Sequence, residues 1–366
     1  MSNPSTKVQT LSLKQFTAFS EATFNFSPGI NVIIGENATG KSHLMKMIYT
    51  LLKVCEIAQQ RKISHDREKL EERFQSQLHD VFQVHNNHEL VRLSTGMAEI
   101  HLDYAGTHFH VQMGVDNFSV QYEPEYLPNP SSVIYLPTRE FLSINEGFIA
   151  AYHKRELPYD ETYYDLSLAL NALPLRQNQL VEVQNAIELL QNAIAGEKWK
   201  KVVQQKNGRF YFDLPEGYLE VNFVADGYRK IGTLLYLLIN GSLSKNSILF
   251  WDEPEANLNP KLVVEVVKVL QTLAKEAGMQ IFIATHDYLL SYELSLLVEY
   301  PSDNPIDIKF FSLHKPDRQS AVIFEEGPTL VDIEHNSILE EFAAHYDREA
   351  AIFYKSTVED STNDTH

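Results

Sequence analysis

Eight consecutive residues, Gly35 to Ser42, have the types and spacing that hold a polyphosphate. They read GENATGKS, with glycine at the first and sixth positions, lysine at the seventh and serine at the eighth. The glycines let successive backbone N–H groups turn inward around phosphate oxygens at a helix N-terminus. The lysine reaches the terminal phosphates, and the serine hydroxyl binds Mg²⁺. This Walker A pattern predicts a nucleotide site whose contacts are Gly35, Glu36, Asn37, Ala38, Thr39, Gly40, Lys41 and Ser42.

Two adjacent acids, Asp252 and Glu253, carry the second chemical signal. They follow the apolar run 247–251, which is typical of a buried strand. Alone, such a run ending in two acids is weak evidence, but its position downstream of a Walker A loop favours a magnesium site. We therefore expect Asp252 to hold Mg²⁺ through water and Glu253 to polarise the attacking water as general base.

The residues that follow narrow the class. Glu253 to Pro260, EPEANLNP, resembles the Walker B and D-loop region of ABC-type ATPases, and is most similar to the RecF, SMC and OLD branch. In that branch the region reads DEPE, then a small residue, then a leucine flanked by polar residues before proline. The resemblance covers roughly residues 5–55 and 130–300. It implies ATP and Mg²⁺ as ligands and places Asn257 among the nucleotide contacts.

A histidine further along the chain resembles the family's switch residue. The segment 283–287 reads IATHD, and in the family a histidine at this strand end faces the γ-phosphate. A lone histidine is usually structural, but this one follows the other motifs in the family's order. The resemblance therefore assigns His286 to the catalytic set with Lys41 and Glu253.

Residues 224–230, VADGYRK, stand where the family carries its signature loop, which opens a helix. Gly227 and the basic pair after it match the family. Ala225 departs from it, because the family usually has a serine there that hydrogen-bonds the γ-phosphate of the opposite subunit's ATP. Backbone amides at Gly227 and the helix dipole remain available for this contact. An ordinary helix start is the alternative interpretation of these residues.

Two other family features are imperfect. No glutamine follows the apolar residues 133–136, so the Q-loop position falls to Thr138, Arg139 or Glu140. Lys14 occupies the stretch where RecF-like members often carry an arginine beside the nucleotide, although a solvated lysine explains it better.

These motifs require an α/β scaffold to position them. Apolar runs at 30–34, 133–136, 247–251 and 281–284 predict buried strands, and apolar residues recur at helical spacing after the glycine loop. Asn259 and Pro260 have the types of an N-cap and first residue of a helix. We expect an ABC-type head with a mixed β-sheet core, an N-terminal antiparallel portion and an inserted helical subdomain.

The expected domain boundaries follow from these patterns. The ATPase core is assigned to 1–55 and 130–350, with a helical and β-hairpin insertion at 56–130, a helical insertion at 145–205 and a disordered tail at 355–366. His108 and His110 share one face of the hairpin, because side chains two apart in a strand point the same way. A metal site there would need a third ligand, and a solvated face is the default.

Composition limits the remaining classes. The chain has 366 residues, one cysteine (Cys55) and a formal charge of −18, and it lacks a stretch of apolar residues of the length that a membrane span needs. We therefore expect a soluble cytoplasmic protein without a disulfide framework and without a membrane partner. The negative charge does not favour DNA, because DNA binding would need a local basic cluster.

The resemblance also implies a dimer. In the family, the signature loop lies far from the other motifs on the same subunit, so a second copy caps the ATP. We expect a homo-oligomer, at least a dimer, that regulates a separately encoded effector, as do similar compact ATPases of phage-defence and abortive-infection systems. The alternatives are a DNA-repair or chromosome-maintenance ATPase and a transporter subunit, and the residues 255–257 and the insertions disfavour the transporter.

Overall fold

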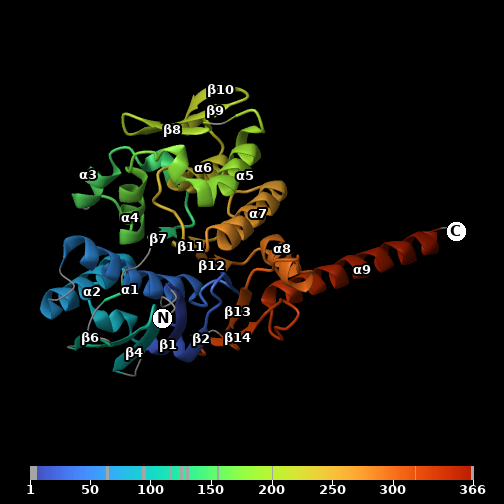
Figure 1. Ribbon diagram of the computed structural model, residues 1–366. Coiled ribbons are helices and arrows are strands. Elements are labelled where there is room, and N and C mark those ends of the chain that lie inside the picture. The colour runs from blue at the N-terminus through green and yellow to red at the C-terminus, as the bar shows by residue number, and fades with distance from the viewer. Residues whose placement is uncertain are drawn as a thin grey trace.

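The apolar runs become the parallel strands of a six-stranded sheet, seen at the centre of the computed structural model (Figure 1). The structure describes residues 6–62, 66–92, 96–115, 117–123, 127–128, 132–154, 156–199, 201–317 and 319–363, without the side chains of the last ten. The sheet order is β14 (Ile323–Gly327), β13 (Ile308–His314), β3 (Ile30–Gly35), β12 (Gln280–Thr285), β11 (Ile248–Asp252) and β7 (Val133–Leu136). Only β14 pairs antiparallel, at one edge.

Both faces of this sheet are covered, which is why its strands read as nearly continuous apolar sequence. Successive residues of β3 point to opposite sides, so Val32 and Ile34 enter one hydrophobic core while Ile33 enters the other. The second core contains α1 (Lys41–Arg61), which has thirteen buried residues among its 21. The helix that follows the glycine loop is therefore enclosed, and the loop sits on a rigid base.

A five-stranded antiparallel sheet covers the other side of α1. Its order is β2 (Phe19–Asn25), β1 (Val8–Phe16), β4 (Met97–Tyr104), β5 (Thr107–Gly114) and β6 (Phe118–Glu123), with α2 (Arg67–Phe82) beside α1. The hairpin expected as part of an insertion pairs along β1, with Leu11 opposite Leu102. It therefore extends the N-terminal sheet and shares its core, rather than forming a unit of its own.

Helices and a small sheet cover the opposite face of the central sheet (Figure 1). They are α3 (Phe148–His153), α4 (Glu161–Leu170), α5 (Gln184–Ala195), α6 (Asp226–Ile239), α7 (Pro260–Glu276), α8 (Tyr288–Glu299), and the strands β8 (Val203–Lys206), β9 (Arg209–Leu214) and β10 (Gly217–Glu220). Short 3₁₀ turns occur at 87–90, 142–144, 177–179, 181–183 and 221–223. As the sequence predicted, Asn259 caps α7 by accepting from the Leu262 N–H at 3.0 Å.

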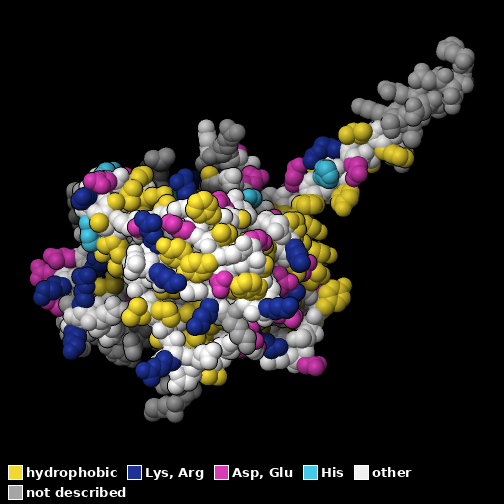
Figure 2. Space-filling view, turned by 90° about the horizontal axis from the view of Figure 1, so that it is seen from above, with side chains coloured by type: hydrophobic (Ala, Val, Ile, Leu, Met, Phe, Trp, Pro, Cys, Tyr) yellow, Lys and Arg dark blue, Asp and Glu magenta, His cyan; other side chains and the backbone are white. Residues whose placement is uncertain are grey.

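The last helix, α9 (Ser337–Asn363), projects from the body (Figures 1 and 2). The sequence predicts a disordered tail from residue 355; the backbone of α9 extends as far as Asn363, and residues 364–366 lie outside the described part of the chain. Within the described residues, none of the helices combines the length and the apolar character that a membrane crossing requires.

Candidate functional site

The glycine loop joins β3 to α1 through backbone conformations that favour glycine. Gly35 has φ +145° and Gly40, the residue before α1, has φ +93°. A Cβ on Gly35 would lie 2.2 Å from the backbone oxygen of Leu313 on β13, so the position has no room for a side chain. Lys41 folds back over the loop, and its Nζ donates to the carbonyls of Gly35 at 2.7 Å and Glu36 at 2.9 Å.

A pocket of about 950 Å³ opens over this loop and the tip of β11. Its lining includes six of the eight predicted loop contacts, Asn37 to Ser42, together with Asp252 and Glu253. The central sheet brings the two motifs together because β3 and β11 both flank β12 and run parallel, so their carboxyl ends lie at one edge. The remaining lining residues are Thr17, Ala18, His43, Arg92, Lys315, Gln319 and Ser320.

Asp252 is buried at the end of β11 and is held by two hydroxyls. The Tyr135 hydroxyl donates to its Oδ2 at 3.1 Å, and the Ser42 side chain is a second hydrogen-bond partner. Burial raises the pKa of Asp252, and these hydrogen bonds oppose the rise. A carboxylate beside a serine hydroxyl is an oxygen donor set, which fits Mg²⁺.

Lys41 is buried among acids. Desolvation lowers the pKa of its ammonium group, whereas the nearby carboxylates of Asp252 and Glu253 raise it, with a net lowering. Its donors reach only backbone oxygens in this structure. A polyphosphate in the pocket would add negative charge that favours the charged ammonium form.

Glu253 and His286 meet beside the pocket. His286 Nδ1 lies 3.2 Å from Glu253 Oε1 and 4.0 Å from Glu255 Oε1. Glu253 has φ +48°, a backbone conformation that is uncommon for a residue with a Cβ and that recurs at functional sites. His286 keeps 53% of its side chain exposed and does not line the pocket itself. The structure thus brings together two of the three predicted catalytic residues, Glu253 and His286, at the rim of the pocket.

Two charged residues, Glu255 and Lys230, lie next to the acids Asp252 and Glu253. The sequence analysis assigned neither of them a role. Glu255 is buried, accepts from Thr285 Oγ1 at 2.7 Å, and has a pKa raised chiefly by burial. Lys230 donates to the carbonyl oxygens of Thr138, at 3.1 Å, and of Glu253. Burial lowers the pKa of Lys230 to about 8. The first turns of α6 are thereby tied to the segment that carries Glu253.

The predicted signature residues lie outside the pocket of their own chain. Ala225 precedes α6 and Gly227 is in its first turn, and neither lines the pocket. A Cβ on Gly227 would lie 2.8 Å from the backbone oxygen of Asn257, which itself has φ +66° and is not a lining residue. Ala225 and Asn257 are therefore exposed outside the pocket, and Gly227 is buried beside the backbone of Asn257.

Two residues at positions where the chain departs from the family pattern form ion pairs with neighbouring side chains. Glu140 forms an ion pair with Arg229 at 3.5 Å, and Lys14 forms one with Glu99 at 3.3 Å. The basic side chains that line the pocket are instead Arg92 and Lys315, in addition to Lys41. Neither lies in a recognisable motif, so no local signal in the sequence singles them out.

The histidines of the hairpin contact other side chains of the same sheet. His108 pairs with Asp103, and His110 stacks on His101 with ring centroids 4.2 Å apart. Among the described residues, the one group with metal-ligand spacing is elsewhere, at His314, Glu325 and His335.

Parts of the chain match known protein families and proteins. Residues 122–291 match the family described as "AAA domain, putative AbiEii toxin, Type IV TA system", and residues 10–76 match a family described as "AAA domain". The chain is 25% identical over 276 residues to the DNA replication and repair protein RecF of Staphylococcus haemolyticus, covering 71% of this chain and 69% of that protein. It is 39% identical to the RecF protein of Staphylococcus aureus strain JH9, but over only 62 residues, 17% of this chain and 16% of that protein.

Solved structures share the fold. A Pyrococcus furiosus Smc head domain, bound to the C-terminal domain of ScpA, is 12% identical and superposes with a TM-score of 0.50 over 92% of this chain and 99% of that one. A SmcHead bound to the C-winged helix domain of ScpA superposes with a TM-score of 0.51 at 11% identity, over 89% and 98%. The mixed α/β architecture expected from the sequence is therefore confirmed.

Proposed function

We propose that this chain, an ABC-like P-loop ATPase of the RecF/SMC branch, binds Mg-ATP and hydrolyses it between two head-to-tail copies of itself. One observation carries the proposal: the loop around Lys41 and the acids Asp252 and Glu253, more than 200 residues apart in the sequence, line the same pocket. A pocket built from backbone N–H groups, a lysine and two carboxylates is suited to a triphosphate with a divalent cation.

Each side chain has a defined task in this proposal. The backbone of residues 35–42 and the Lys41 ammonium group hold the β- and γ-phosphates. Ser42 and Asp252 provide the oxygen ligands for Mg²⁺, which neutralises phosphate charge when it is bound. Glu253 accepts a proton from the attacking water, and His286, whose Nδ1 lies 3.2 Å from Glu253 Oε1, orients that carboxylate from beside the pocket.

A second copy is required because the signature residues do not reach their own pocket. Ala225 and Gly227 lie at the start of α6, where backbone N–H groups and the helix dipole favour an anion. Docked head to tail, each copy would cap the other's ATP with this helix start. The missing serine at Ala225 leaves the backbone as the capping group, and Asn257 lies alongside it.

Glu253→Gln tests both parts of the proposal, because it removes the general base but keeps the shape of the side chain. We expect hydrolysis to fall by about 10²–10⁴-fold, the usual contribution of general base catalysis. ATP binding should persist, and light scattering after size exclusion should show a dimer only with Mg-ATP. Glu188→Gln, at an exposed position of α5, is the control. A monomer under every nucleotide condition would contradict the dimer, and a wild-type chain without ATPase activity would contradict the enzyme.

We infer that ATP binding and hydrolysis by this chain control a separate effector protein in a cytoplasmic phage-defence system. The toxin–antitoxin description of the family matching residues 122–291 supports this context. The helix α9 supports a protein partner, because it leaves the body with Phe342 and Tyr346 exposed. Co-expression with the adjacent reading frames, followed by purification of Glu253→Gln with and without Mg-ATP, should retain one partner in a nucleotide-dependent way. Recovery of this polypeptide alone in both conditions would contradict it.

A DNA-repair role is the second candidate, favoured by the similarity to RecF. The charge opposes it, with 31 basic against 49 acidic residues. On the face shown in Figure 2, basic side chains are interspersed with acidic and apolar ones instead of forming a band. Fluorescence anisotropy with duplex DNA at several salt concentrations separates the two roles. ATP-dependent binding that weakens steeply with salt would favour repair.

A further inference from the structure

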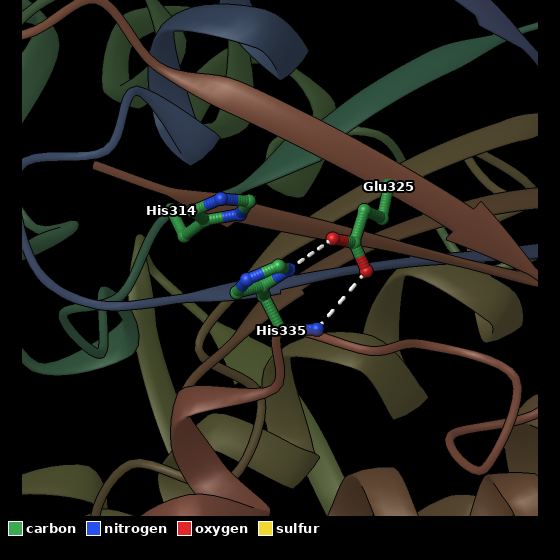
Figure 3. Close-up of side chains that lie close together, drawn as sticks. All are labelled: His314, Glu325 and His335. Carbon is green, nitrogen blue, oxygen red and sulfur yellow. Dashed lines mark hydrogen bonds and ion pairs between the residues drawn. The ribbon is translucent and has the colours of Figure 1, made fainter. Parts of the chain in front are cut away.

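Three side chains near the root of α9 converge outside the nucleotide pocket (Figure 3). His314 is the last residue of β13, Glu325 lies in β14, and His335 precedes α9 by two residues. One potential ligand atom from each lies within 4.8 Å of the other two. Two imidazoles and a carboxylate, brought together from three segments, form a metal-binding donor set.

The contacts within this cluster leave one donor atom unused. Glu325 accepts from the backbone N–H groups of Glu334 and His335, at 2.9 and 3.0 Å, and its other oxygen lies 2.5 Å from His335 Nδ1. The rings of His314 and His335 stack with centroids 4.6 Å apart. His314 Nδ1 is buried and has no hydrogen-bond partner among the described residues. A buried ring nitrogen with no partner is unusual, and metal coordination is one way to satisfy it.

We propose that His314, Glu325 and His335 bind one divalent transition metal ion of the zinc type. Two nitrogen ligands and one carboxylate suit zinc, whereas Mg²⁺ and Ca²⁺ prefer oxygen-only sets. With three protein ligands the fourth position takes water, as in open zinc sites. The backbone N–H groups that hold the carboxylate of Glu325 orient it, as outer partners orient ligands in metal sites.

The spacing is close to what an ion requires. In a tetrahedral site, two ligands that each lie about 2.1 Å from zinc are about 3.4 Å apart. The widest separation allowed by the present arrangement, 4.8 Å, would have to shorten by about 1.4 Å, which side-chain rotations can provide. His335 is half exposed, so it can rotate away from Glu325 without disturbing the core.

An ion at this location would lie between the start of α9 and the strand that borders the nucleotide pocket. Ser312 Oγ donates to the His335 carbonyl at 2.6 Å, and Asn336 accepts from the Ile338 N–H at the start of α9. On the same strand, Leu313 pairs with Gly35 of the glycine loop, and Lys315 lines the nucleotide pocket. A bound ion would thus fasten the root of α9 to the edge of the nucleotide site.

The test is zinc titration of the untagged full chain, in excess Mg²⁺ and without nucleotide, against a chromophoric chelator. We expect one equivalent of zinc in the wild type and an affinity at least about tenfold lower in His335→Gln, because one of three ligands is lost. His108→Gln is the matched control, since His108 also pairs with an acid on a sheet surface but belongs to no three-ligand group among the described residues. It should bind zinc as the wild type does.

Two further measurements keep the result interpretable. Zinc should raise the midpoint of thermal unfolding of the wild type but not of His335→Gln, and both apo proteins should unfold cooperatively. Ser42→Ala should leave zinc binding unchanged, because it alters only the nucleotide site. If wild type and His335→Gln bind zinc equally, the ion is adventitious and the proposal is overturned. The proposal is also overturned if Ser42→Ala is the one variant that loses zinc binding.

Discussion

Tyr135→Phe removes one oxygen atom from the support of the predicted magnesium ligand. Tyr135 is buried on β7, and its ring packs on Tyr49 and Phe250, contacts that phenylalanine would keep. Burial raises the pKa of Tyr135 well above its usual value, so its hydroxyl stays protonated and donates to Asp252. The substitution therefore leaves Asp252 with one hydroxyl partner, that of Ser42.

The size of the effect follows from the kind of hydrogen bond. A bond to a charged acceptor contributes about 1.5–3 kcal/mol, which corresponds to about one to two pKa units. The pKa of Asp252, already raised by burial, should rise further. The acid limb of the ATPase pH profile should move to higher pH by about one unit. The Mg²⁺ concentration for half-maximal activity should increase about 10–100-fold, as when outer partners of metal ligands are lost.

The assay is ATP hydrolysis as a function of Mg²⁺ at fixed ATP, repeated from pH 5.5 to 9. Tyr236→Phe is the control, because its hydroxyl donates to the side chain of Gln205 and not to an acid of the site. A change of less than twofold in the Mg²⁺ requirement of Tyr135→Phe, with an unshifted acid limb, would refute the role assigned to Asp252.

Gly35→Ala places a Cβ 2.2 Å from the Leu313 oxygen, so ATP affinity measured by calorimetry should fall at least about tenfold, and wild-type affinity would contradict the tight fit. Thr285→Val leaves the buried carboxylate of Glu255 without its hydroxyl donor and should lower the free energy of unfolding in urea by about 1–3 kcal/mol. An unchanged urea midpoint would show that this bond contributes little. Glu161→Gln should stabilise the chain at pH 8 but not at pH 5, measured by urea unfolding at both values.

The sign of this last effect follows from the pKa of Glu161, which burial raises from 4.5 to about 7. The folded state then binds the proton more tightly than the unfolded state, so stability is lost as pH rises from about 4.5 to about 7. Glutamine carries no charge and avoids this loss, which amounts to at most about 3 kcal/mol. Glu72→Gln, exposed on α2, is the control, and a pH profile unchanged by Glu161→Gln would contradict the reasoning.

The sequence alone predicted the local structure where a few adjacent residues determine the backbone conformation. The glycine loop between an apolar run and a helix could be predicted because positive φ at Gly40 and helical periodicity after it are local properties. Asn259 before Pro260 predicted the start of α7 for the same reason.

Sequence reasoning failed where a contact joins distant segments. The hairpin at 97–114 reads as an insertion because nothing local says that it pairs with β1.

The residue types at 35–42 and 252–253 by themselves determined the chemistry that the chain can attempt, because few other patterns suit a phosphate and a divalent cation. The tertiary structure alone decided which side chains share the site. The parallel order of β3, β12 and β11 brings their carboxyl ends to one edge, and β7 adds Tyr135 below Asp252. The tertiary structure also brings together His314, Glu325 and His335, whose spacing in the sequence follows no helical or strand period. These residues meet because strand pairing, and not local propensity, determines which residues become neighbours.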